Sequence, residues 1–143
     1  MRLFADDTKI TALRRPSLFE RLSREELSEL AKMTEEVDVA AGKVHCKEGE
    51  IGRELFVIME GEVEVTRRGN SIGTYGSGDF LGEIALIEDV PRTATMTAKT
   101  PLRLFVMTRQ AFLRLLDAHP KVERNVSRAL AKRIVRTSSD PTL

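Results

Sequence analysis

Residues 78–87 read GDFLGEIALI, and residues 91–95 read PRTAT. Gly82 allows the backbone to leave a strand through a sharp bend, and residues 83–87 are long enough for one short helical turn. The first N–H groups of such a turn lack partners within it, and the positive end of its dipole attracts anions. Arg92 follows on the segment that returns past the bend, and its planar guanidinium suits two oxygens of one anion. These residues predict a phosphate site.

Glu83 narrows the class of ligand, because a carboxylate beside a phosphate would repel it. An ionised carboxylate only accepts hydrogen bonds, so it suits the hydroxyl donors of a sugar. Its position in the first turn of the short helix also suits the helix dipole. A ligand with a hydroxylated sugar at one end and a single phosphate at the other would satisfy both charges.

The two segments closely resemble the phosphate-binding cassette of the cyclic-nucleotide-binding domain family, which catabolite-activator-type regulators, cyclic-nucleotide-dependent kinases and cyclic-nucleotide-gated channels share. The nine-residue step from Glu83 to Arg92 is the family's usual spacing. The resemblance implies that Gly82 and Glu83 hold the ribose 2′-hydroxyl. It also implies that Arg92 and the backbone N–H groups of Ala85 and Thr93 hold the cyclic phosphate. The expected ligand-binding residues are Gly82, Glu83, Ile84, Ala85, Arg92, Thr93 and Ala94.

The resemblance extends over most of the chain but has two departures. Leu81 stands where many members carry phenylalanine, an apolar exchange with little consequence for the ligand. No aromatic residue follows Phe112, although many members cover the purine with a side chain of the C-terminal helix. The candidates to cover the base are therefore aliphatic or guanidinium groups, namely Leu130, Arg133 and Ile134.

The identity of the base stays open. In the family, a threonine after the arginine can bond a guanine, and Thr93 stands at that position. Threonine also occurs there in domains that bind adenine. The resemblance thus favours cAMP, on the general habit of the family, and leaves cGMP as an alternative.

The fold class follows from the glycines and from the period of the apolar residues. All nine glycines lie between residues 42 and 82, and apolar residues alternate with polar ones at residues 62–66 and 95–98. Short, half-buried strands between turns are typical of a sandwich or jelly roll. We expect a mainly β (α+β) protein: an eight-stranded antiparallel jelly-roll barrel with an N-terminal helix, a short phosphate-binding helix and two C-terminal helices.

Helix signals flank this β region. Ser23 and Glu26 form a capping box at the start of a helix that we expect to end near Thr34. Thr108 can cap a second helix, and Pro120 suits the first position of a third that ends near residue 135. We expect one domain over residues 1–143, divided into an N-terminal helical segment (14–34), the barrel (35–107) and the C-terminal helices (108–136).

Composition excludes several classes of protein. The chain has 143 residues, a net charge of +1 and a single cysteine, so neither a second large domain nor an internal disulfide is expected. No segment resembles a secretion signal or a membrane span, which predicts a cytoplasmic protein. The two histidines, His45 and His119, are far apart in sequence and form no metal-ligand pattern. Catalytic fingerprints are absent, so we expect no enzyme, cofactor or metal.

We therefore expect a regulatory module that binds a cyclic nucleotide and signals by movement of its C-terminal helices. The final helix is basic, and it is the candidate surface for a protein effector or a homodimer partner. Only a short tail follows this helix, so a DNA-binding domain is expected only if the chain is a fragment. The alternative is a ligand-free structural or protein-interaction domain of the same fold.

Overall fold

The computed structural model describes residues 6–15, 19–82 and 91–120, together with residues 123, 124, 127, 128 and 131. Three helices are described over their full length: α1 (Asp6–Leu13), α2 (Arg24–Lys32) and α3 (Arg109–Ala118). The strands of the same residues are β1 (Glu35–Val39), β2 (Val44–Cys46), β3 (Glu54–Glu60), β4 (Val63–Arg67), β5 (Asn70–Tyr75), β6 (Phe80–Leu81), β7 (Thr95–Ala98) and β8 (Leu102–Thr108).

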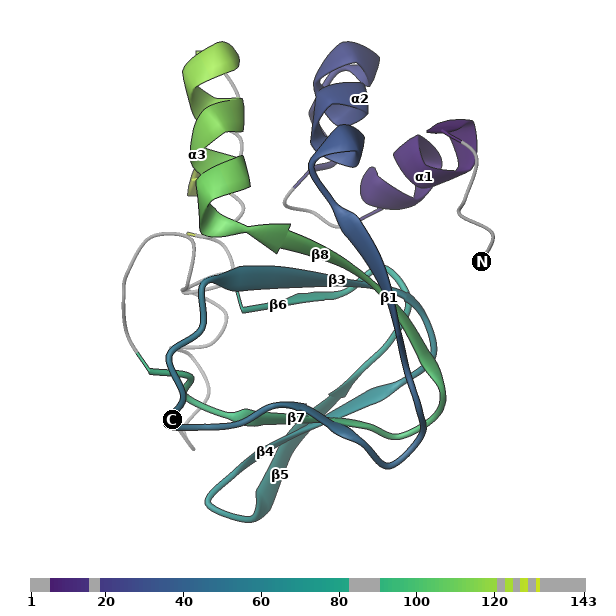
Figure 1. Ribbon diagram of the computed structural model, residues 1–143, viewed down its shortest axis with the longest axis vertical. Helices are drawn as coiled ribbons and strands as arrows, with labels where there is room; N and C mark the ends of the chain where they lie inside the picture. Colours follow the sequence, from purple (N-terminus) through teal and green to yellow (C-terminus); the bar gives the residue numbers. More distant parts are fainter. Residues whose placement is uncertain are drawn as a thin grey trace.

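The strands form two antiparallel sheets that face each other, with the helices on the outer side of the first (Figure 1). The first sheet has the order β1-β8-β3-β6, and the second has the order β2-β7-β4-β5. The expected mainly β, antiparallel fold is therefore confirmed. The expected closure into one barrel is not found among the described residues, where the two ladders stay separate. The strand β6 has only two residues, and both pair with β3.

The central strands of the first sheet are buried on both faces. In β3 every residue from Leu55 to Met59 is buried, as expected for a strand between two layers. Leu55, Val57 and Met59 pack toward the helices, whereas Phe56 and Ile58 pack toward the second sheet. The chain thus has two apolar clusters, and the first sheet lies between them.

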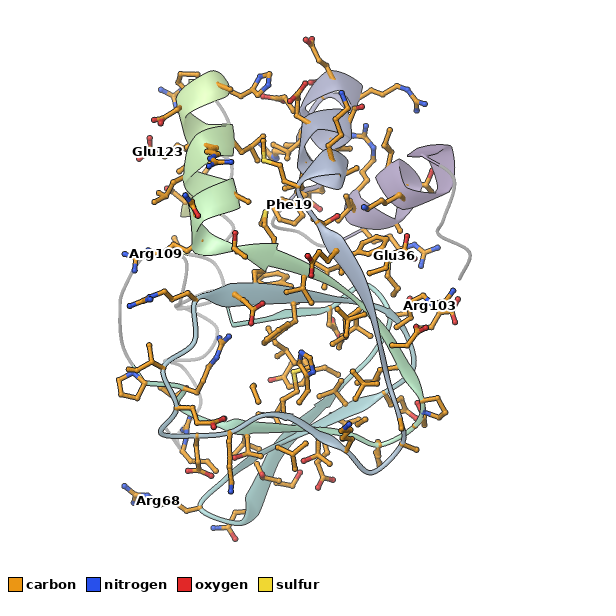
Figure 2. The ribbon with its side chains drawn as sticks, in the orientation of Figure 1. Phe19, Glu36, Arg68, Arg103, Arg109 and Glu123 are labelled. Atoms are coloured by element: carbon orange, nitrogen blue, oxygen red, sulfur yellow. The ribbon has the colours of Figure 1, made fainter. Side chains whose placement is uncertain are left out.

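The cluster under the helices joins all three helices to β3 and β8. Phe19 is fully buried in it and lies between the helices and the sheet (Figure 2). The side chain of Ser23 accepts a hydrogen bond from Glu26 N–H, and the Glu26 carboxylate accepts one from Ser23 N–H. The predicted capping box is confirmed. Leu27, Leu30 and Ala31 of α2 are buried as expected.

The other helical signals have different outcomes. Thr108 caps α3, whose Phe112 and Leu115 are buried, as its sequence predicts. Sequence analysis did not predict α1, because its few apolar residues form no clear helical stripe. In the helix predicted from Pro120, the described residues 120, 123, 124, 127, 128 and 131 are helical, and the others lie outside the described residues. No described helix is both long and apolar enough to cross a lipid bilayer.

The β4–β5 hairpin turns through two residues with positive φ, Arg68 (φ 52°) and Gly69 (φ 81°). Two consecutive positive φ angles match the twist of the flanking strands. The backbone N–H of Arg68 donates to the carboxylate of Glu48 at 3.1 Å, which stabilises this unusual arginine conformation. The Arg68 side chain extends away from the sheets at the hairpin tip (Figure 2).

Candidate ligand-binding site

The backbone of Arg92 is held by the loop between β2 and β3. Arg92 N–H donates to the carbonyl of Glu50 at 2.7 Å, and Gly49 N–H donates to the carbonyl of Arg92 at 2.9 Å. An isolated antiparallel bridge pairs Ile51 with Pro91 beside them. The backbone of Arg92 is therefore fixed just before β7, and its side chain extends from this fixed position.

The guanidinium of Arg92 lies against β3. Its Nη2 donates a hydrogen bond to the carbonyl of Glu54 at 2.9 Å, and its Cζ lies 5.0 Å from the ring centre of Phe56. The face of an aromatic ring attracts a cation, with a contribution of about 0.5 to 2 kcal/mol. Because Phe56 belongs to the cluster between the sheets, the positive charge is directed toward the inter-sheet space.

Two glycines, which have no side chain, leave space for the guanidinium of Arg92. A Cβ atom at Gly52 would overlap the guanidinium of Arg92. A Cβ atom at Gly82 would lie 2.7 Å from Nη1 of Arg92 and 2.7 Å from the carbonyl oxygen of Glu54. Gly82 also has a φ of +84°, which L side chains rarely adopt. Both glycines are therefore required for the observed position of the arginine.

The structure brings Gly82 and Arg92 together, as the sequence analysis expected. Thr93 is exposed, and its carbonyl accepts a hydrogen bond from Nε of Arg67 at 3.0 Å. Ala94 is half-buried and packs against the inter-sheet cluster. Glu83, Ile84 and Ala85 lie outside the described residues, and so do the proposed base-covering residues Leu130, Arg133 and Ile134.

A polar network fixes the segment that carries Arg92 to the hairpin. The Glu48 N–H donates to Oγ1 of Thr95 at 3.1 Å, and this hydroxyl donates back to Oε1 of Glu48 at 3.3 Å. The same carboxylate accepts from the Arg68 backbone at the β4–β5 turn. No local sequence pattern pairs Glu48 with Thr95, because their contact joins segments that are far apart in the chain.

His45 and Cys46 are additional neighbours that sequence analysis gave no ligand role. The ring of His45 lies edge-on to Phe56, with 4.8 Å between ring centres and 78° between planes. Burial lowers the pKa of His45; Glu54 raises it and Arg92 lowers it further, by smaller amounts. Burial raises the pKa of the Cys46 thiol, which keeps it protonated. No sequence pattern signals this placement, because it depends on a local irregularity of β2.

The two facing sheets with helices on one outer face define a jelly-roll β domain. Residues 36–119 match the family model described as "Cyclic nucleotide-binding domain". The chain belongs to the cyclic nucleotide-binding domain family. Its similarity to this family thus covers both sheets and α3.

Relatives and solved structures agree with this assignment. The chain is 35% identical over 101 residues to the cGMP-dependent protein kinase egl-4 of Caenorhabditis briggsae, a match that covers 71% of this chain and 14% of the kinase. It is 42% identical over 80 residues to the cAMP-dependent protein kinase regulatory subunit of Yarrowia lipolytica, a match that covers 54% of this chain and 21% of the subunit. The chain therefore spans only a small part of these relatives.

Among solved structures, the N-terminal domain of a transcriptional regulator from Streptomyces coelicolor A3(2) superposes with a TM-score of 0.79. Its sequence is 32% identical, and the match covers 90% of this chain and 93% of that domain. A similar architecture over nearly all of both chains indicates that the helices and the sheets form a unit shared by both proteins.

Proposed function

We propose that this chain binds a cyclic nucleotide through Arg92 and acts as a regulatory module without catalytic activity. The observation that carries the proposal is the position of the Arg92 guanidinium, which two glycines and the ring of Phe56 direct toward the inter-sheet space. A half-buried, permanently charged group is suited to an anionic ligand. The match to a family of cyclic nucleotide-binding domains supports the same ligand class.

In this proposal the remaining contacts come from the cassette residues. Arg92 holds the cyclic phosphate with the N–H groups of Ala85 and Thr93, and Gly82 and Glu83 hold the ribose. Ile84 and Ala94 line the same site. The ligand is cAMP in preference to cGMP, and one of Leu130, Arg133 and Ile134 covers the base.

The route by which binding would reach the C-terminal helices begins beside Arg92. Gly52, Arg53 and Glu54 are consecutive: Gly52 adjoins the guanidinium, and the Glu54 carbonyl accepts its hydrogen bond. The carbonyl between them, that of Arg53, accepts a hydrogen bond of 2.8 Å from Arg109 N–H in the first turn of α3. A shift of the guanidinium toward a ligand would release Glu54 and disturb the start of α3, which is how we propose that binding moves the C-terminal helices.

A second function, that of a ligand-free structural or protein-interaction domain, is favoured by one observation. The guanidinium of Arg92 already has an internal acceptor at Glu54 and an aromatic face at Phe56. An arginine satisfied in this way contributes to the fold without any ligand. In that case its removal would destabilise the protein and would affect no binding reaction.

Thermal-shift titrations with cAMP and with cGMP distinguish the two functions. A ligand at a hundred times its Kd adds about 2.7 kcal/mol to the free energy of unfolding. We expect a saturable rise of the melting temperature with at least one of the nucleotides, and the larger affinity with cAMP. No shift with either nucleotide, in a protein that unfolds cooperatively, would favour the ligand-free domain.

A further inference from the structure

A β-bulge in β2 places His45 near the candidate phosphate site. Val44 pairs with Thr97 and Cys46 pairs with Met96, so the register shifts between them and His45 is the extra residue. A bulge redirects side chains that would otherwise alternate between the faces of a sheet. As a result, both His45 and Cys46 contact the cluster between the sheets, His45 through Phe56.

His45 and Arg92 share the ring of Phe56. The imidazole approaches it edge-on at 4.8 Å between ring centres, and the guanidinium carbon lies 5.0 Å from the centre of the same ring. A half-buried histidine is therefore placed close to the permanent positive charge that would receive the ligand. Neither residue needs to move for the charge on one to act on the other.

Burial opposes the protonation of His45 in the free protein, and the two nearby charges act in opposite directions. Burial lowers the pKa of His45 most, Glu54 on β3 raises it, and Arg92 lowers it by a smaller amount. Burial raises the pKa of Cys46 beside it and outweighs the lowering by Arg92 and the Met96 backbone, while Glu50 and Glu54 raise it slightly, so the thiol adds no charge. These are the charged and titratable groups that shift the pKa values of His45 and Cys46.

We propose that His45 takes up a proton when an anionic cyclic nucleotide binds at Arg92, so that ligand affinity rises as the pH falls. This inference rests on the proposed function. The negative ligand offsets the field of Arg92 at the imidazole and adds an attraction of its own. Protonation, in turn, gives the site a second positive charge.

The direction of the pH dependence follows from linkage. The ligand raises the pKa of His45, so the complex binds more protons than the free protein between the two pKa values. Affinity is highest below the pKa of the free protein and lowest above the pKa of the complex. Each unit by which the ligand raises the pKa corresponds to about a tenfold gain in affinity between these limits. We expect a gain of about threefold to tenfold.

Titration calorimetry with cAMP, and separately with cGMP, tests this inference. Each titration is performed near pH 6, in two buffers that differ in ionisation enthalpy, because the difference in observed heat gives the number of protons taken up. The proteins are the wild type, His45→Gln and His45→Phe. His119→Gln is the matched control, because it removes the only other histidine of the chain, at the C-terminal end of α3. A series from about pH 5 to 8 then gives the affinity profile.

We expect the wild type and His119→Gln to take up a fraction of a proton per ligand and to bind more tightly at lower pH. Both His45 variants should bind ligand with less proton uptake and a flatter profile. Binding with the same uptake in wild type and His45 variants would overturn this inference and leave the proposed function intact. Absence of binding to the wild type at every pH would overturn both.

Discussion

The two faces of the first sheet show how one set of strands serves two purposes. On the face toward the helices, alternate residues of β3 and β8 pack in an apolar cluster, and one cation reaches it: Lys9 Nζ lies 5.3 Å from the ring centre of Phe105 and donates to the Thr34 carbonyl. On the face toward the second sheet, the cluster is also apolar, but Arg92 and His45 reach one of its members, Phe56. The comparison indicates that the helix face, covered by α1, α2 and α3, holds the fold together, whereas the inter-sheet face brings a guanidinium and an imidazole to one aromatic ring.

The largest effect is expected from a cavity on the helix face. Phe105 is 1% exposed and lies in the cluster under the helices, so Phe105→Ala should lower the free energy of unfolding by about 3 to 5 kcal/mol. Urea denaturation measures the loss. Leu113→Ala is the control, because Leu113 is 48% exposed and should change stability by less than about 0.5 kcal/mol. Equal losses in both variants would contradict the assignment of this face to stability.

Removal of Arg92 should affect ligand binding more than stability, in contrast to Phe105→Ala. Arg92→Ala should weaken cyclic-nucleotide binding by about 2 to 5 kcal/mol, because the ligand phosphate loses its charged partner. The free energy of unfolding should change by less, about 1 to 2 kcal/mol, since one internal hydrogen bond and the contact with the Phe56 ring are lost. Calorimetry and urea denaturation on the same preparation separate the two quantities. A large loss of stability would assign Arg92 to the fold.

A substitution at Gly82 tests whether the guanidinium of Arg92 needs the space beside this glycine. Gly82→Ala should destabilise the protein by about 1 to 3 kcal/mol and also weaken ligand binding, because the new Cβ would meet both Arg92 and the Glu54 carbonyl. Gly42→Ala is the matched control: Gly42 has a similar φ of +85°, but its Cβ would have no neighbour within 4 Å. The control should show backbone strain alone, with unchanged ligand affinity. Similar affinities for both variants would contradict the proposed approach of Arg92.

A smaller effect is expected at the N-terminal end of α3. The Thr108 hydroxyl accepts a hydrogen bond from Ala111 N–H at 3.1 Å, so Thr108→Ala should cost about 1 kcal/mol of stability. Thr108→Ser keeps the hydroxyl and should restore most of the loss. If serine were no better than alanine in thermal unfolding, the cap would not be the source of the effect.

The smallest effect is expected in the pH dependence of the free protein. His45 has a folded-state pKa below its ordinary value of about 6.5, so the unfolded chain binds more protons as the pH falls past that value. Its contribution to stability is fully present above the ordinary value and is lost as the pH falls toward the folded-state pKa. Urea midpoints should fall more steeply with acid in the wild type than in His45→Gln. Parallel curves would contradict a buried, neutral imidazole.

Local signals explain what could be predicted from the sequence. The capping box at Ser23 and the cap at Thr108 depend on residues a few positions apart, and both form as expected. The alternation at residues 95–98 likewise produces a strand with alternating burial. The family's spacing concerns Glu83 and Arg92, and the structure brings Gly82, the residue before Glu83, against the guanidinium of Arg92.

Other features depend on interactions that the sequence does not reveal. The bulge at His45 arises from the register between β2 and β7, which are distant in the chain. The positive φ of Arg68 depends on an acceptor that Glu48 supplies from another loop. The helix α1 has few apolar residues, and its burial of Ile10 and Leu13 depends on the cluster that α2 and α3 provide. Long-range packing decided each of these features.

The central claim is that Arg92 recognises the negative charge of a cyclic phosphate. It is tested most directly by calorimetric comparison of cAMP with its neutral methyl phosphotriester, in the wild type and in Arg92→Ala. We predict that the wild type prefers the anion by about thirtyfold or more, and that the variant binds both forms with nearly equal, weak affinity. An undiminished preference for the anion in Arg92→Ala, or none in the wild type, would contradict the claim.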